Sequence, residues 1–296
     1  MSDGATEHDA GARHLPPAET GSTGAARPRS AGEAAPVTVA RPEPGIAVVT
    51  LDAPSTRNSL SRQTIALLDE AIAALAADAG VAAIVLAATG PAFSAGHDLK
   101  ELTRHRADPD GGRAFYAETM RACARLMQAV VACPRPVIAA VEGVATAAGC
   151  QLVATCDLAV AATTATFATP GVNIGLFCST PMVALSRNVP RKRAMEMLLL
   201  GEMVTAEEAE RHGLVNRVVP PDRVRDEALA MARIIAAKSP VTVAIGKEAF
   251  YRQIEQPLAE AYDYAASVMV ENMMARDAAE GIGAFLEKRP PAWKGC

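Results

Sequence analysis

Residues 136–154 read PVIAAVEGVATAAGCQLVA. The run 136–141 is apolar, rich in β-branched residues and preceded by proline, which is typical of a buried strand. Glycine and alanine then dominate 143–149, and such small residues let a ligand approach the main chain closely. If a helix begins near Ala147, its first N–H groups lack internal partners and point outward at the positive end of the helix dipole, where they can bind an oxyanion.

A second turn of this kind lies about fifty residues upstream, at FSAGHDL, 93–99. An amide from this turn would complete a two-donor oxyanion hole. The alternative is that the small residues in both turns only allow a helix to pack tightly on a sheet. A phosphate-binding loop is excluded, because Gly143 and Gly149 are too far apart for GxxxxGK and Cys150 and Gln151 follow the second glycine.

Strand and helix patterns alternate on both sides of these turns. Short apolar, β-branched runs predict strands at 46–51, 83–86, 136–141, 158–161, 166–168 and 215–219. Residues 64–77 and 113–131 carry apolar side chains at three- and four-residue spacing, which predicts helices lying on a sheet. The sequence therefore predicts an α/β fold.

The two ends of the chain differ from this central part. Residues 1–36 are rich in Ala, Gly, Pro, Ser and Thr and are predicted to form a disordered tail. A mitochondrial presequence is the alternative, but acidic residues such as Glu7 and Asp9 argue against it. After the predicted core, 37–221, a C-terminal region at 222–296 looks all-helical and is expected to pack on the core or on a partner subunit.

Composition narrows the partners and the compartment. The net charge of -4 and the pI near 5.8 give no footprint for nucleic acid or an anionic membrane, so neither is expected as a partner. The most apolar stretch, 143–162, contains Gln151 and Asp157 and does not look like a membrane span. Six cysteines without a CxxC pair suit a reducing compartment, and a cytoplasmic location is expected.

The two turns, in this order and spacing, resemble those of the crotonase (enoyl-CoA hydratase/isomerase) superfamily. Further matches are TCDLA at 155–159, FATP at 167–170 and FLEKR at 285–289, so the resemblance covers roughly residues 38–293. It is closest to the enoyl-CoA hydratase domain-containing subgroup. The resemblance implies a spiral of ββα units, a C-terminal helical region that forms a homotrimer, and often a hexamer made of two trimers.

The resemblance also implies a ligand, an acyl-CoA or enoyl-CoA thioester, with no metal and no cofactor beyond the coenzyme A of the substrate. The backbone amides of His97 and Ala148 match the two oxyanion donors. Two cations, Arg57 and Lys288, match residues near the CoA phosphates, the second reaching across from a neighbouring subunit. Residues that match the loop lining the adenine and pantetheine parts of CoA are Ala95, His97, Asp98, Leu99 and Lys100.

The chain departs from the family at its acid and base. The two catalytic glutamates of the hydratases correspond to Gln151, which cannot accept a proton, and to Gly171, which has no side chain. Ser179 stands where dienoyl isomerases carry a carboxylate. Cys178 stands where decarboxylases carry a tyrosine, and is interpreted as a buried small hydrophobe rather than a nucleophile.

Three functions remain open on the sequence. The chain is a member of the hydratase/isomerase class that stabilises a thioester enolate, although hydration itself lacks its acid and base. Alternatively it is an acyl-CoA decarboxylase or double-bond isomerase, because those reactions need less help from an external base. In the third reading it is a catalytically weak acyl-CoA-binding or modulatory protein.

Other polar residues near the turns have plain alternatives to catalysis. The His97 ring either acts as an acid or base or rests against the acyl chain while only its amide is used. Asp98 is expected to cap a helix. Glu101 is expected to face solvent, Glu142 to make a structural hydrogen bond, and Asp157 to be structural.

Overall fold

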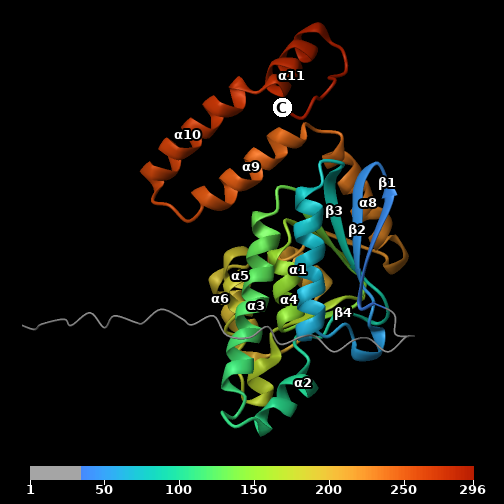
Figure 1. Cartoon of the computed structure of the whole chain (residues 1–296), viewed down its shortest axis with the longest axis vertical. Coiled ribbons are helices and arrows are strands. Elements are labelled where there is room, and N and C mark those ends of the chain that lie inside the picture. The colour runs from blue at the N-terminus through green and yellow to red at the C-terminus, as the bar shows by residue number, and fades with distance from the viewer. Residues whose placement is uncertain (1–34) are drawn as a thin grey trace, which may run out of the picture. The chain divides into compact units, whose positions relative to one another are not determined.

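The computed structural model describes residues 35–296, whose strands form two sheets (Figure 1). The six-stranded sheet has the order β1 (Val37–Glu43), β2 (Gly45–Leu51), β3 (Val81–Ala88), β5 (Val137–Val141), β7 (Leu158–Ala162) and β10 (Arg217–Val219). The four-stranded sheet has the order β4 (Ala92–Ser94), β6 (Val144–Thr146), β8 (Thr166–Ala168) and β9 (Val204–Thr205).

Helices surround these sheets and continue beyond them. They are α1 (Arg62–Ala77), α2 (Leu99–Arg104), α3 (Arg113–Ala132), α4 (Ala148–Thr155), α5 (Pro181–Asn188), α6 (Arg191–Leu200), α7 (Ala206–Arg211), α8 (Val224–Ala236), α9 (Pro240–Gln253), α10 (Leu258–Met274) and α11 (Arg276–Glu287). Helix α1 packs against α3, and α8 packs against β2, β3, β5 and β7. The predicted α/β class is confirmed.

Successive strands alternate between the sheets, which produces the spiral. In each of the pairs β3–β4, β5–β6 and β7–β8, the first strand joins the larger sheet and the second joins the smaller one. Strand β6 pairs in parallel with both β4 and β8. The carboxyl ends of these three strands therefore meet at one edge, and the segments that follow them, 95–98, 147–151 and 169–171, are brought together there.

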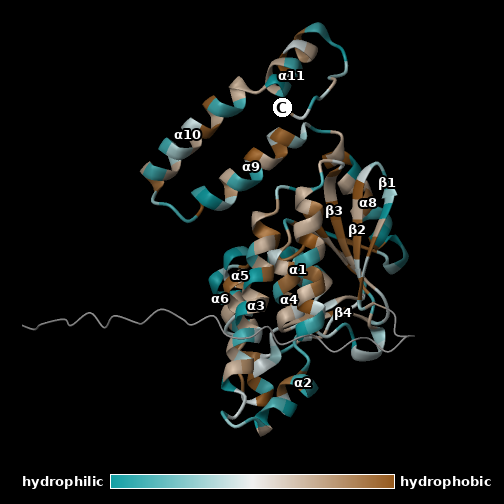
Figure 2. Cartoon of the chain, viewed as in Figure 1, coloured by the Kyte–Doolittle hydropathy of each residue, from teal (hydrophilic) through white to brown (hydrophobic). Residues whose placement is uncertain are grey.

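The core lies in the larger sheet and the helices packed on it. Central strands such as β3 and β5 are almost continuously apolar, and Figure 2 shows β3 in the brown of hydrophobic residues. Ile84 and Ile138 are fully buried. A strand covered on both faces needs such an unbroken apolar run, which explains why these strands were predictable from sequence.

The C-terminal arm, defined as residues 238–296, has little core of its own. Helices α9 and α10 run side by side and α11 contacts both. Its buried residues are Ser239, Asp277 and Ala284. Large exposed apolar side chains in the arm are Phe250, Ile254, Leu258, Tyr262, Met269, Val270, Met273, Met274, Ile282, Phe285 and Leu286.

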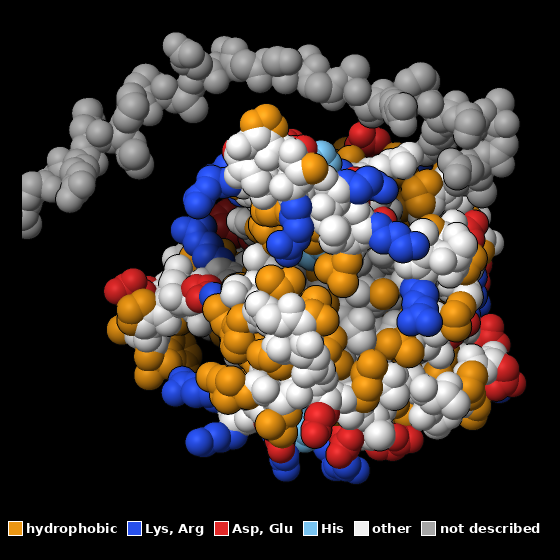
Figure 3. Space-filling model, turned by 90° about the horizontal axis from the view of Figure 1, so that it is seen from below, with side chains coloured by type: hydrophobic (Ala, Val, Ile, Leu, Met, Phe, Trp, Pro, Cys, Tyr) orange, Lys and Arg blue, Asp and Glu red, His pale blue; other side chains and the backbone are white. Residues whose placement is uncertain are grey.

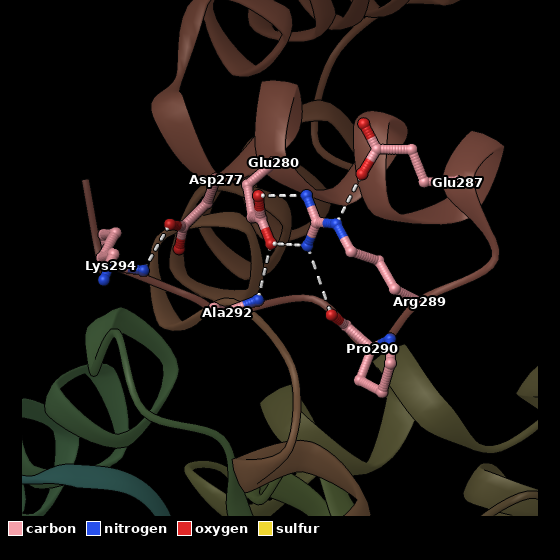
Figure 4. Close-up of polar contacts among 7 residues, drawn as sticks. All are labelled: Asp277, Glu280, Glu287, Arg289, Pro290, Ala292 and Lys294. Carbon is pink, nitrogen blue, oxygen red and sulfur yellow. Dashed lines mark hydrogen bonds and ion pairs between the residues drawn. The ribbon is translucent and has the colours of Figure 1, made fainter.

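A polar cluster closes the end of the arm (Figure 4). Glu280 accepts hydrogen bonds from both Nη atoms of Arg289, at 2.6 and 3.0 Å, and from the amide of Ala292 at 2.7 Å. The Arg289 contact lowers the pKa of Glu280 to about 2. Asp277 accepts from the amide of Lys294 at 2.7 Å. These contacts fold the last residues back onto α11.

The structure does not test the domain boundaries predicted from the sequence. The tail predicted at 1–36 and the presequence alternative fall almost wholly outside the described residues. The division at 221/222 stays a prediction; the last strand, β10, ends just before it, yet α8 beyond it packs on the sheet. Within residues 35–296, no single helix is long and apolar enough to cross a membrane, and one bent helix pair, Pro221–Ala236 with Pro240–Gln253, passes by length and composition only.

Candidate functional site

Strands β4 and β6 approach each other so closely, at their starts and in the turns that follow them, that two glycines are required. A Cβ placed on Gly149 would lie 2.2 Å from the carbonyl oxygen of Ser94, and one on Gly143 would lie 2.2 Å from that of Pro91. Both distances are far inside van der Waals contact. These glycines therefore do more than let a helix pack on a sheet. They allow α4 and β6 to lie directly against the chain that leads into the first turn.

Among residues 95–98 of the first turn, a single amide is left without an acceptor. The N–H groups of Ala95 and Asp98 donate to carbonyl groups of segment 57–60, at 3.0 and 3.4 Å. That of Gly96 donates to the hydroxyl of Ser94 at 3.2 Å. The N–H of His97, between them, has no acceptor within the described part of the chain.

The second turn is strained at the residue before its free amide. Ala147 has φ 50° and ψ -119°, a conformation that costs a residue with a Cβ about 1–3 kcal/mol. It is held there because its N–H donates to the carbonyl of Ala168, at the end of β8, at 2.9 Å. Ala148 then begins α4, is fully buried, and has no acceptor for its N–H among residues 35–296.

The two free amides lie on turns that touch. A Cβ on Gly96, the neighbour of His97, would lie 3.1 Å from the nitrogen of Ala148. Two unsatisfied N–H donors beside each other at a sheet edge form a place that a carbonyl oxygen or an oxyanion can occupy. The sequence paired these positions by resemblance, and the fold brings them to one edge.

His97 is partly buried, and the Nε2 atom of its ring is buried without a hydrogen-bond partner in the structure described. Burial lowers the pKa of this imidazole to about 4, so the ring is neutral near pH 7. Two further buried side-chain oxygens without partners follow the neighbouring strands, Gln151 Oε1 on α4 and Thr169 Oγ1 after β8. The edge is therefore polar but carries no charge on these three side chains.

Other residues occupy the space beside Gly171, the position that corresponds to the second family glutamate. A Cβ on Gly171 would lie 2.9 Å from the carbonyl oxygen of Leu176 and 3.0 Å from Cys178 Sγ. Burial raises the pKa of the Cys178 thiol, an effect that the N–H of Gly171 partly opposes by donating to the sulfur. Cys178 is thus a buried neutral thiol, and a side chain at 171 has little room.

Residues matched to the CoA loop sit on or beside the first turn. Asp98 is the N-cap of α2, as its position in the sequence indicated, and accepts from the amides of Lys100 and Glu101 at 2.9 and 3.0 Å. Leu99 and Lys100 are exposed. Lys288 follows α11 in the arm, which Figure 1 shows away from β4, so the fold of one chain does not bring it to the turns.

Lys and Arg side chains are grouped on the face that carries α2, with exposed hydrophobic side chains between them (Figure 3). The exposed basic residues of this region are Lys100, Arg104, Arg106 and Arg113. Arg57 is also exposed, and its carbonyl is the acceptor for Ala95. The first turn therefore has positive charge nearby, although the chain as a whole is acidic.

Two expectations about glutamates were wrong. Glu101 does not simply face solvent: its Oε2 accepts from the amide of Arg62 at 2.9 Å and so caps the start of α1. Glu142 is exposed and makes no hydrogen bond within the described residues, so it has no structural bond of the kind expected. Spacing along the chain could not reveal either outcome, since both depend on which element comes opposite.

Sequence reasoning missed Lys247, the partner of Asp157. Its side chain is almost fully buried, and its Nζ donates to Asp157 Oδ2 at 2.7 Å and to the carbonyl of Val130 at 3.0 Å. Asp157 also accepts from the hydroxyl of Tyr251 at 3.0 Å. Asp157 is thus structural, as expected, and it holds α9 to the core. A lone lysine within the apolar pattern TVAIGKEAF was the available signal.

Comparison with known proteins places this chain among acyl-CoA enzymes and their relatives. The Enoyl-CoA hydratase/isomerase family model matches residues 41–296. Enoyl-CoA hydratase domain-containing protein 3, mitochondrial, of Rattus norvegicus is 46% identical over 92% of this chain and 89% of its own length. The crystal structure of the human protein of that name is 48% identical, has a TM-score of 0.83, and covers 87% of this chain and 100% of its own. An enoyl-CoA hydratase structure from Mycobacterium smegmatis is 53% identical, with a TM-score of 0.83 over 87% of this chain and 98% of its own.

These relatives correct one expectation and establish another. The animal relatives are named as mitochondrial, which contradicts the cytoplasmic location expected from the cysteines. The cysteines in the structure are all free, but reduced thiols indicate only a reducing compartment and not which one. The match over residues 41–296, with relatives at 46–48% identity, shows that this chain belongs to the enoyl-CoA hydratase/isomerase (crotonase) family.

Proposed function

We propose that this chain binds an acyl-CoA thioester and holds its carbonyl oxygen between the N–H groups of His97 and Ala148, so that the enolate form is stabilised. The observation that carries the proposal is that these two amides, on touching turns, both lack an acceptor. An unpaired N–H in a buried place costs roughly 1–3 kcal/mol, and a ligand oxygen would remove that cost. Each such donor contributes about 3 kcal/mol to an oxyanion in other enzymes.

The reaction class follows from what the site lacks. Gln151 and Gly171 supply neither an acid nor a base, and the buried His97 ring is neutral near pH 7. Decarboxylation of an acyl-CoA suits such a site better than hydration, because loss of CO2 leaves the enolate without removal of a proton by the protein. Double-bond migration passes through the same enolate, but it still needs a group that carries a proton from one carbon to another. Chemistry is therefore assigned mainly to the main-chain donors.

The basic face supports coenzyme A as the carrier of the acyl group. Arg57 and Lys100 flank the first turn and are exposed, so they can reach phosphate groups without losing a partner in the described part of the chain. CoA carries its negative charge on phosphates and its reactive thioester on an uncharged arm. A charged outer face next to an uncharged inner edge matches that division.

A catalytically weak acyl-CoA-binding protein is the second candidate. The packing around Gly171 favours it, because Cys178 Sγ and the Leu176 carbonyl occupy the space into which a catalytic side chain would extend. In this form the oxyanion donors bind the thioester without turning it over.

A homotrimer, or a hexamer of two trimers, is proposed as the assembly. The exposed apolar side chains of α10 and α11 support it, since an apolar surface of this kind is usually covered by another subunit. Lys288 would then reach the CoA of a neighbouring subunit. Light scattering of the purified full-length protein measures the mass, and a monomer at micromolar concentration contradicts the assembly.

The amide donors can be tested one at a time. Replacing Ala148 with lactic acid converts its amide to an ester and deletes the N–H while keeping the side chain. Ala206 is a matched control, because it is also buried, also begins a helix, and its N–H also has no acceptor among residues 35–296. Acyl-CoA affinity is expected to fall about tenfold or more for the ester at 148 and to stay unchanged for the ester at 206.

Products decide between the two candidates. Saturated, 2-enoyl, 3-enoyl and malonyl-type thioesters are incubated with the wild type and with His97→Ala, which keeps the amide but loses the ring, and the products are identified by mass spectrometry. Turnover of any thioester supports an enzyme, whereas tight binding without product supports the binding protein. Hydration of crotonyl-CoA above about 1 s⁻¹ would show that another residue replaces the glutamates. Failure to bind any acyl-CoA would contradict both candidates.

A further inference from the structure

Segment 57–60 runs beside the first turn and uses up the amides on either side of His97. The N–H of Ala95 donates to the first residue of the segment at 3.0 Å, and that of Asp98 donates to its last residue at 3.4 Å. In return, the last residue of the segment donates its own N–H to the carbonyl of Gly96 at 2.7 Å. The segment and the turn therefore pair like short parallel strands, and the N–H of His97 is the one left over.

One side chain fastens this segment to the sheets. Asn58 Nδ2 donates to the carbonyls of Thr89 and Ala92, both at 2.8 Å, and its Oδ1 accepts from the amide of Ala53 at 2.8 Å. Thr89 follows β3 and Ala92 begins β4, so the bonds join the segment to the chain that leads into the first turn. Asn58 is only 1% exposed, which protects these bonds from water.

The backbone conformation of the segment is not one that its residues favour on their own. Arg57 and Asn58 have φ 54° and 51°, two successive residues with side chains in the left-handed region. This conformation is unfavourable for most residues, and asparagine tolerates it better than others. It persists where surrounding contacts over-determine it, and the three hydrogen bonds of Asn58 are such contacts.

We propose that Asn58 is a positioning residue for the oxyanion hole. Its side chain fixes segment 57–60, the segment occupies the amides of Ala95 and Asp98, and the N–H of His97 is thereby aimed at the ligand. Asn58 touches neither substrate nor reacting atoms. The inference rests on the proposed function, because it concerns the orientation of one of the two donors named there.

The test reads the polarisation of the bound thioester rather than stability. An acyl-CoA labelled with ¹³C at the thioester carbonyl is bound to the full-length protein, and the carbonyl stretch is isolated by isotope-edited infrared difference spectroscopy. Two donors on the oxygen lower this frequency. Affinity for free CoA is measured in parallel by calorimetry. Free CoA lacks the thioester carbonyl, so its affinity reports only on the rest of the site.

Asn58→Gly is the informative variant, because glycine adopts φ 51° without strain and only the three hydrogen bonds are lost. The frequency shift is expected to shrink by about half and acyl-CoA affinity to fall about tenfold, with CoA affinity within about threefold of wild type. Asn188→Ala is the matched control, since Asn188 Nδ2 also bridges two carbonyls, those of Ala154 and Ala184, at 2.8 and 2.9 Å. It is expected to leave the shift unchanged.

The outcomes separate this inference from the function on which it rests. A folded Asn58→Gly protein with the full wild-type shift overturns the positioning role, as does an equal loss in the Asn188 control. A wild type that binds acyl-CoA without any shift overturns the proposed oxyanion hole itself. Should Asn58→Gly not fold, Asn58→Ser retains one donor, and an intermediate shift with intact CoA affinity is the expected result.

Discussion

The paired turns and the C-terminal arm are built on opposite principles. In the turns, adding one methyl group to Gly149 would place it 2.2 Å from a carbonyl oxygen, whereas in the arm a methyl group on Gly246 or Gly283 would meet nothing within 4 Å. The turns are specified by main-chain contacts within one chain. The arm carries its apolar side chains outward, where no other part of residues 35–296 covers them. The chain thus completes its own donors within one copy, whereas the surface of the arm is what the proposed assembly would cover.

The largest expected effect comes from a substitution in the paired turns. Gly149→Ala drives a Cβ against the backbone of Ser94, which cannot move without separating the two turns. The expected loss is about 5 kcal/mol of unfolding free energy, which equals the whole stability of a domain at the low end of the usual range. Gly283→Ala in α11 is the control, and is expected to stabilise by about 0.5–1 kcal/mol because alanine is the better helix former. Urea unfolding measures both, and a near-neutral Gly149→Ala would contradict the close approach.

The second prediction concerns the tether between arm and core. Lys247→Met leaves Asp157 buried without its cation, and an uncompensated buried charge costs about 3 kcal/mol. The arm is also expected to detach, so that limited proteolysis cuts at 237–239, between α8 and α9. Adding Asp157→Asn removes the charge and should recover part of the stability. Equal protease resistance of wild type and Lys247→Met would show that other contacts hold the arm.

The third prediction tests the burial of His97 through pH. Its pKa is about 4 in the folded chain and 6.5 when exposed, so below pH 6.5 the unfolded chain binds a proton that the folded chain does not. The contribution of His97 to stability is therefore fully present above pH 6.5 and is lost as pH falls toward 4, by roughly 3 kcal/mol in total. Unfolding of the wild type and of His97→Leu is compared between pH 5 and 6.5, above the range where most carboxylates titrate. An identical slope in both proteins would mean that His97 is not buried.

The same contrast explains what could be predicted from sequence. Long apolar strands and the amphipathic α1 and α3 were predictable because their periodicity is local. The strands β4 and β6 are three residues long and were missed, whereas β8, which is equally short, was predicted at 166–168. Asn58 and Lys247 were missed as well, because their partners lie 31 to 34 and 90 residues away and only the folded chain brings them together. Glycines 143 and 149 were recognised through their spacing, but the contact that requires them was not readable.

The smallest expected effect separates binding from folding at the edge of the site. Arg57 has φ 54°, so its backbone would be relieved by glycine, while its exposed side chain makes no hydrogen bond in the structure described. Arg57→Gly is therefore expected to leave the unfolding free energy unchanged within about 0.5 kcal/mol. If the guanidinium binds a CoA phosphate, affinity for CoA falls about tenfold, or about 1.4 kcal/mol, and the loss shrinks as salt is raised. Arg225→Gly in α8 is the control with the opposite pattern. Glycine at this helical position is expected to lower the unfolding free energy, while the affinity for CoA stays unchanged. An Arg57→Gly protein that binds CoA normally would remove the charge of this residue from the site and leave the main chain of segment 57–60 as its whole contribution.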